Sequence, residues 1–194
     1  MKEAYLKALE GAFSEAPFDD DVANFFRTAW HHKTFKKGEF ITEAGNRERY
    51  FYLMLGGVQM LYLIDAKGEK VVLGFTFSGE FSGVYDSLMT NKPADYFLEA
   101  LTDTECLRIS SEDYKALFED YTAFDRWGRL FIQRILLGRV SREVELLTKS
   151  AEERFVAFMR RCPPALRDVP QKYIASYLNM KPETFSRLRA SADY

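Results

Sequence analysis

The chain has 194 residues, of which 47% are hydrophobic and 29% charged, and its formal net charge is −2. This composition excludes an intrinsically disordered chain, and the slightly negative charge excludes a protein that does nothing except bind nucleic acid. No apolar run is long enough to span a membrane, and the first residues lack the apolar segment of a signal peptide. We therefore expect a globular protein of one or two domains in the cytoplasm, with no membrane partner.

The two cysteines, Cys106 and Cys162, stand far apart and have no metal-binding spacing, so we expect reduced core thiols. Charge is distributed unevenly along the chain. From Arg154 to the end there are eight basic and three acidic residues, whereas residues 1–153 hold 19 basic and 26 acidic ones. A basic end on an acidic body is typical of a phosphate-binding module attached to another domain, although chance clustering would give the same counts.

The first third begins with two helices, which the apolar spacing predicts at residues 3–13 and 19–31. From Lys33 the pattern changes to short strands separated by turn glycines. The expected strands cover residues 34–38, 39–45, 50–55, 58–64, 70–77, 96–101 and 105–109. Many short strands at regular spacing predict an antiparallel sandwich or barrel of the jelly-roll kind.

A long helix is predicted at residues 122–147 by its apolar periodicity, after a shorter helix that begins at Ser110. It carries two apolar stripes. Trp127, Phe131 and Ile135 repeat every four residues and can lie on the barrel. The second stripe follows a 3,4 heptad and consists of Leu130, Leu137, Val140, Val144 and Leu147. This second stripe predicts a coiled-coil seam with a second copy of the chain; the alternative is a helix buried on both sides in a monomer.

The C-terminal part is predicted to begin after a hinge at residues 148–149. Ser150 and Glu153 have the spacing of a capping box and start a new helix. This helix is expected to run to Arg161 and to stop at Pro163–Pro164.

Two short helices joined by a tight turn are predicted in residues 170–189. Pro170 opens the first and Pro182 the second, since proline is favoured at a helix start. Apolar residues at helical spacing form an inner face, and long polar side chains remain on the outer face. This is the pattern of a helix-turn-helix. An ordinary αα-corner is the alternative, because the usual turn glycine is absent from residues 179–181.

The order of these modules resembles the Crp/Fnr transcription factors, and the resemblance extends from about Phe26 to Arg189. Four segments carry it: residues 37–41 with Gly45 as opening strands, 55–58 as the central turn, 77–83 as the entry to the phosphate-binding cassette, and 182–187 as the recognition helix. The last segment, Pro-Glu-Thr-Phe-Ser-Arg, is similar to the family pattern Arg-Glu-Thr-Val-x-Arg.

The resemblance implies an α+β fold with an N-terminal antiparallel double-stranded β-roll. The expected parts are a cyclic-nucleotide-binding-like sensor domain at 1–121, a dimerisation helix and hinge at 122–149, and a helix-turn-helix domain at 150–194. The implied function is that of a homodimeric, sequence-specific transcription regulator, not an enzyme, with a pseudo-palindromic DNA operator and RNA polymerase as partners. Because the sequence stops at Tyr194, the family's two-stranded wing is expected to be reduced or missing. The alternative is a ligand-binding or interaction module whose helix-turn-helix no longer binds DNA.

By the same resemblance, Glu183 and Arg187 occupy the base-reading positions of the recognition helix. They are four residues apart and therefore on one helix face. Pro182 replaces the family's first arginine, so the operator should differ from the usual half-site. The residues expected at DNA phosphates are Gln171, Lys181, Thr184 and Arg189.

The resemblance also implies a ligand pocket inside the roll, formed by Phe81, Gly83, Val84, Tyr85, Ala94, Asp95 and Tyr96. Val84 stands where cyclic-AMP-binding members have the glutamate that holds the ribose. Ala94 and Asp95 stand where they have the Arg-Ser pair that holds the phosphate, and Asp95 would repel a phosphate. No response to cyclic AMP is therefore expected. The effector stays open, and a roll filled by its own side chains is an equal alternative.

Neither a cofactor nor a metal site is expected. An iron–sulfur sensor needs about four cysteines, and the only histidines, His31 and His32, are expected before the barrel as helix-end residues. Residues 33–109 contain no histidine. A cupin-type enzyme, which needs histidine and carboxylate ligands inside its roll, is therefore disfavoured.

Overall fold

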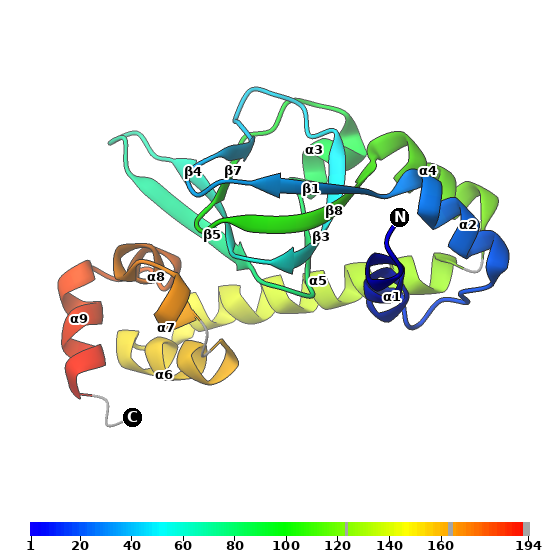
Figure 1. The fold of residues 1–194 in the computed structure, drawn as a ribbon. Coiled ribbons are helices and arrows are strands. Elements are labelled where there is room, and N and C mark those ends of the chain that lie inside the picture. The colour runs from blue at the N-terminus through cyan, green and yellow to red at the C-terminus, as the bar shows by residue number, and fades with distance from the viewer. Residues whose placement is uncertain (123, 163–164, 192–194) are drawn as a thin grey trace. The chain divides into compact units, whose positions relative to one another are not determined.

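The computed structural model describes residues 1–122, 124–162 and 165–191 (Figure 1). The chain divides into two compact units, of which the first comprises Met1–Leu61 and Phe75–Ile132 and the second Tyr62–Gly74 and Gln133–Tyr194. Two expectations fall on residues outside this description. One is the end of a helix at Pro163–Pro164, and the other is the reduced wing expected at the end of the chain.

Antiparallel strands form the framework of the first unit. The strands are β1 (His31–Phe35), β2 (Phe40–Thr42), β3 (Tyr50–Gly56), β4 (Gln59–Ile64), β5 (Lys70–Thr76), β6 (Phe81–Ser82), β7 (Phe97–Ala100) and β8 (Thr104–Ser110). They make two four-stranded sheets, ordered β1-β8-β3-β6 and β2-β7-β4-β5. The pairs β1–β8, β3–β8, β3–β6 and β2–β7 are antiparallel. The predicted α+β class with an antiparallel roll is confirmed.

Helices precede, interrupt and follow these strands. The helices are α1 (Glu3–Ala12), α2 (Asp20–Ala29), α3 (Tyr85–Thr90), α4 (Ser111–Asp120), α5 (Phe124–Thr148), α6 (Ala151–Arg161), α7 (Ala165–Asp168), α8 (Gln171–Tyr177) and α9 (Pro182–Ser191). Helix α5 contributes its first residues to one unit and the rest to the other, as does strand β4. Among the described residues, no helix combines the length and hydropathy needed to cross a membrane.

Several local predictions differ from the structure. His31 and His32 belong to strand β1 and are not helix-end residues, because α2 ends at Ala29 and the backbone is already extended at Trp30. There, His32 stacks on Tyr5 with ring centroids 5.1 Å apart. Pro170 is the residue before α8 and not its first residue. The short elements β6, α3 and α7 were not predicted, since each is too short to show a period.

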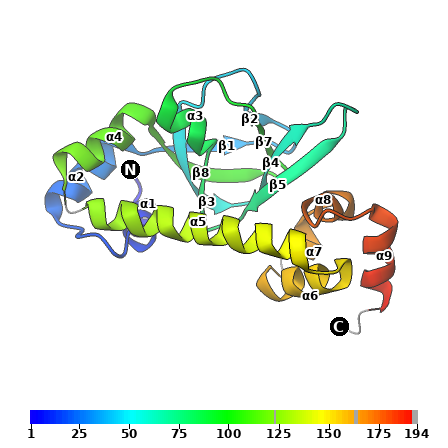
Figure 2. The same cartoon turned by 180° about the vertical axis from the view of Figure 1, so that it is seen from behind.

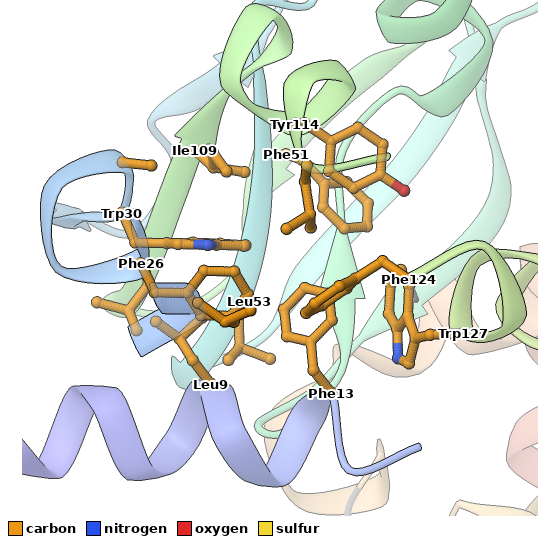
Figure 3. Close-up of a cluster of buried hydrophobic side chains, with 14 of the residues drawn as sticks. Leu9, Phe13, Phe26, Trp30, Phe51, Leu53, Ile109, Tyr114, Phe124 and Trp127 are labelled. Carbon is orange, nitrogen blue, oxygen red and sulfur yellow. The ribbon is translucent and has the colours of Figure 1, made fainter. Parts of the chain in front are cut away.

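The main hydrophobic core of the first unit is dominated by aromatic rings (Figure 3). Phe13, which follows α1, lies at its centre with 0% exposure. Its ring centroid is 5.1 Å from that of Phe26 on α2, 5.6 Å from that of Phe124 and 4.4 Å from that of Trp127 on α5. Burying aromatic side chains of this size supplies a large share of folding stability. The core therefore fixes the two N-terminal helices and the start of α5 on the sheet that contains β3.

Candidate nucleic-acid interface and ligand pocket

The turn between α8 and α9 has the geometry of a Schellman motif. Asn179 follows the last turn of α8 with a φ of 51°, in the left-handed region. Its N–H donates to the carbonyl of Ser176 at 3.0 Å, and the N–H of Met180 donates to the carbonyl of Ala175 at 3.0 Å. Asparagine tolerates this conformation better than most residues. Asn179 therefore takes the place of the turn glycine whose absence weakened the sequence pattern.

Helices α8 and α9 lie beside α6 (Figure 2), and buried apolar side chains hold the three together. Ile174 and Ala175 of α8 and Phe185 of α9 are each 0% exposed. The ring of Phe185 contacts that of Phe155 on α6, with centroids 5.4 Å apart. Helix α9 thus has one buried face, as the apolar spacing indicated.

The outer face of this pair of helices carries the residues predicted to contact DNA. Gln171, Lys181, Glu183 and Arg187 are exposed, and Thr184 and Arg189 are half-buried. Within the described part of the chain, none of these six side chains makes a hydrogen bond or an ion pair. Glu183 and Arg187 stand one turn apart on α9. The arrangement leaves one acceptor and one guanidinium fork open toward solvent.

Arg154 of α6 links the residue after α5 to the turn between α8 and α9. Its guanidinium donates to the carbonyl of Leu178 at 2.9 Å, to that of Asn179 at 3.2 Å and to that of Lys149 at 2.5 Å. The predicted capping box of Ser150 with Glu153 is present at the start of α6. No local pattern identifies Arg154, because its partners lie 24 and 25 residues away.

A second contact fixes the end of α5. Glu145 is 8% exposed and accepts two hydrogen bonds from Arg161, at 2.7 and 2.8 Å. Lys149 adds a third at 3.0 Å. The hydrogen bond from Arg161 is the main reason why the pKa of Glu145 lies below its ordinary value. The pair holds α6 against the last turns of α5.

The predicted seam on α5 is largely exposed. Leu137, Val140, Val144 and Leu147 are 68%, 47%, 51% and 78% exposed, whereas Leu130 is half-buried. A further exposed residue of α5, Leu136, lies beside this row, four residues before Val140. Exposed apolar surface on this scale marks an interaction site in a globular protein.

The first stripe of α5 is shorter than predicted. Trp127 is buried in the aromatic core and Phe131 packs against it. Ile135, expected to continue this stripe, is instead 40% exposed. The period of four residues drifts around a helix of 3.6 residues per turn, so the third member no longer faces the core.

Five of the seven predicted pocket residues are divided between two apolar clusters. Val84, Ala94 and Tyr96 belong to a small apolar cluster with Leu98, Ile41 and Leu61. Phe81 and Tyr85 pack instead against the aromatic core. Gly83 adopts a φ of 134°, and Asp95 is exposed. Among the described residues, no cluster of three histidine, cysteine or acidic side chains could hold a metal ion.

A buried carboxylate anchors the cassette entry. Glu48 is 4% exposed and accepts hydrogen bonds from the N–H groups of Arg49 at 3.0 Å, Tyr50 at 3.1 Å and Val84 at 3.2 Å, and from the hydroxyl of Thr42 at 2.5 Å. Val84 is the residue before α3. Nothing in the local sequence distinguishes Glu48 from a surface glutamate, so the sequence did not identify it.

Replacing Glu48 with alanine should lower the free energy of unfolding by about 3 kcal/mol, because one buried and two partly buried N–H groups lose their acceptor. Urea unfolding checks this, with the exposed Glu43→Ala as control. Burial raises the pKa of Glu48. The stability that Glu48 contributes is therefore present below the unfolded pKa and is lost as the pH rises through the folded pKa. The difference in the free energy of unfolding between the wild type and Glu48→Ala should be larger at about pH 5 than at about pH 8. A difference that grows with rising pH would contradict this.

The chain is similar to one family of domains and to several solved structures. Residues 32–121 match the family model described as the cyclic nucleotide-binding domain. No curated protein sequence matches the chain. Similar solved structures include FixK2 from Bradyrhizobium japonicum, with a TM-score of 0.73, 18% identity and coverage of 83% of each chain. The c-di-GMP responsive global regulator CLP from Xanthomonas campestris has a TM-score of 0.64 and 18% identity, with 89% of this chain and 90% of CLP covered.

A third structure, from Eubacterium rectale, is described as a transcriptional regulator of the Crp/Fnr family. It has a TM-score of 0.70 and 16% identity, and the match covers 88% of this chain and 82% of that one. Identities this low establish a shared fold and no more. Residues 32–121 are similar to a cyclic nucleotide-binding domain, and the chain has the fold of the Crp/Fnr transcriptional regulators.

Proposed function

We propose that the chain is a homodimeric transcription regulator that binds a specific DNA sequence and is not controlled by cyclic AMP. The observation that carries this proposal is the outer face of the helix-turn-helix, where Glu183 and Arg187 are exposed one turn apart. A guanidinium fork fits O6 and N7 of guanine, and a carboxylate accepts from N4 of cytosine. Both side chains are free to reach base edges in a major groove.

The exposed apolar row on α5 supports the homodimer. A monomer would leave Leu137 and Leu147 mostly in water. Pairing this row with the same row of a second copy removes it from water, as in a coiled coil. A two-fold dimer presents two recognition helices, so the operator should be pseudo-palindromic with half-sites about one or two helical turns apart.

DNA binding at several salt concentrations tests the proposal. Phosphate contacts release counterions, so the logarithm of the affinity should fall linearly with the logarithm of salt concentration. Lys181→Ala should make this slope shallower by about one counterion and weaken all sequences alike. Absence of any salt-dependent binding by the wild type would favour the interaction module instead.

Positions 84, 94 and 95 of the β-roll lack the side chains that would hold the ribose and phosphate of a cyclic nucleotide. The N–H of Val84 is bonded to the Glu48 carboxylate. The N–H of Ala94 donates to the carbonyl of Asn46, and its own carbonyl accepts from Gly45, both at 2.8 Å. No arginine stands at position 94 or 95, and one flexible lysine is a poor substitute for a guanidinium fork.

Calorimetric titration with cyclic AMP should therefore show no binding at micromolar concentrations. The variant Asp95→Ser serves as control, because it removes the exposed charge while leaving position 94 without an arginine; it should not bind either. A sub-micromolar affinity in the wild type would contradict the argument from the missing side chains.

A further inference from the structure

We propose that the hairpin of β4 and β5 positions the helix-turn-helix for DNA binding through Ser176 and Arg142, which act as positioning residues. This inference rests on the proposed function. The contact concerned, called here the hairpin contact, lies within the second unit. It joins Lys70, Val72 and Leu73 of β5 to Arg139, Arg142, Ser176 and Tyr177.

Ser176 of α8 provides strand β5 with the hydrogen-bond partners that a neighbouring strand would provide. Its hydroxyl accepts a hydrogen bond from the N–H of Val72 at 3.0 Å and donates to the carbonyl of Lys70 at 3.0 Å. Strand β5 is at the edge of its sheet, and edge strands present unpaired N–H and C=O groups. A hydroxyl is both donor and acceptor, so it can satisfy two such groups at once.

Arg142 of α5 fixes the other end of the contact. Its guanidinium donates to the carbonyl of Tyr177, the last residue of α8, at 2.9 Å and lies 4.5 Å from the centre of the Tyr177 ring. A cation at a helix C-terminus is favourable. The same nitrogen is 3.5 Å from the carbonyl of Val72, and Arg139 donates to that of Leu73 at 3.3 Å. The hairpin, α5 and α8 are thereby held in one arrangement.

The hairpin contact leaves the predicted DNA-reading face open. It uses Ser176 and Tyr177 of α8 and no residue of α9. The exposed Glu183 and Arg187 take no part in it. A contact that orients the helix-turn-helix without covering it affects the distance and angle between two recognition helices in a dimer. It should not affect which bases each helix prefers.

The test compares Ser176→Ala with Ser176→Thr, which keeps the hydroxyl, and with Ser141→Ala, an exposed serine outside the contact. Alanine is a good helix former, so α8 should stay folded. Hydrogen exchange of the full-length protein, read on peptides covering residues 70–76, measures the contact without DNA. Selection from random DNA with variable spacers between half-sites measures its role.

Ser176→Ala should speed exchange in the hairpin peptides and reduce the preference for the best spacer by about tenfold, within the range of known couplings. Its half-site motif should stay unchanged, and Ser176→Thr and Ser141→Ala should match the wild type. If hydrogen exchange in the hairpin peptides or the spacer preference is unchanged in Ser176→Ala, the inference is wrong, whereas the proposed function is unaffected. Absence of salt-dependent DNA binding by the wild type would instead overturn the proposed function, and this role with it.

Discussion

Changing Val140 and Val144 together to glutamate should separate the dimer into monomers. Both residues lie on the exposed apolar row of α5, at 47% and 51% exposure. In a two-fold seam each new carboxylate would be buried close to its copy, and uncompensated buried charge costs about 3–5 kcal/mol. Since each 1.4 kcal/mol is a factor of ten, the dimer should weaken by about two to three orders of magnitude. Analytical ultracentrifugation at micromolar concentration measures this directly.

Gly138→Glu with Ser141→Glu is the matched control. Both positions are on the same helix and exposed, and a side-chain carbon at Gly138 would meet no atom within 4 Å. The control adds the same charge without touching the apolar row, so it should sediment as a dimer. A wild type that sediments as a monomer would contradict the seam, as would a Val140/Val144 variant that stays dimeric.

The layout of the fold could be predicted from sequence because periodicity is local. Alternating strands and glycine turns located most of the roll, and the capping box of Ser150 with Glu153 located α6. The turn between α8 and α9 also had a local signal: Asn179 is among the residue types that accept a positive φ. An asparagine can therefore end α8 in the left-handed conformation where the sequence pattern lacks a glycine.

What the sequence could not give depends on contacts between distant residues. Ser176 and Val72 are 104 residues apart, and no property of either residue announces their hydrogen bond. Glu48 differs from the exposed Glu43 only in what surrounds it. The predicted pocket residues fall into two apolar clusters for a related reason. Phe81 and Tyr85 face the aromatic core, whereas Val84 between them faces the roll.

Arg187→Ala should cost about 1–3 kcal/mol of binding to the best DNA site and relax the preference at one base pair of each half-site. The reason is geometric. Arg187 is exposed on α9, its guanidinium has no partner among the described residues, and Glu183 stands one turn before it. A bidentate contact with guanine would be lost, while the phosphate contacts would remain. Selection from random DNA, followed by titration of the enriched site, measures both effects.

Lys181→Ala is the matched comparison, because it removes a positive charge from the exposed residue that precedes α9. A phosphate contact carries no sequence information. Lys181→Ala should therefore weaken all sequences alike, without changing the enriched motif. If Arg187→Ala enriches the same motif as the wild type, then Arg187 does not read a base. In that case an enriched palindrome would have to be read by other residues of α9, of which Glu183 is the first to test.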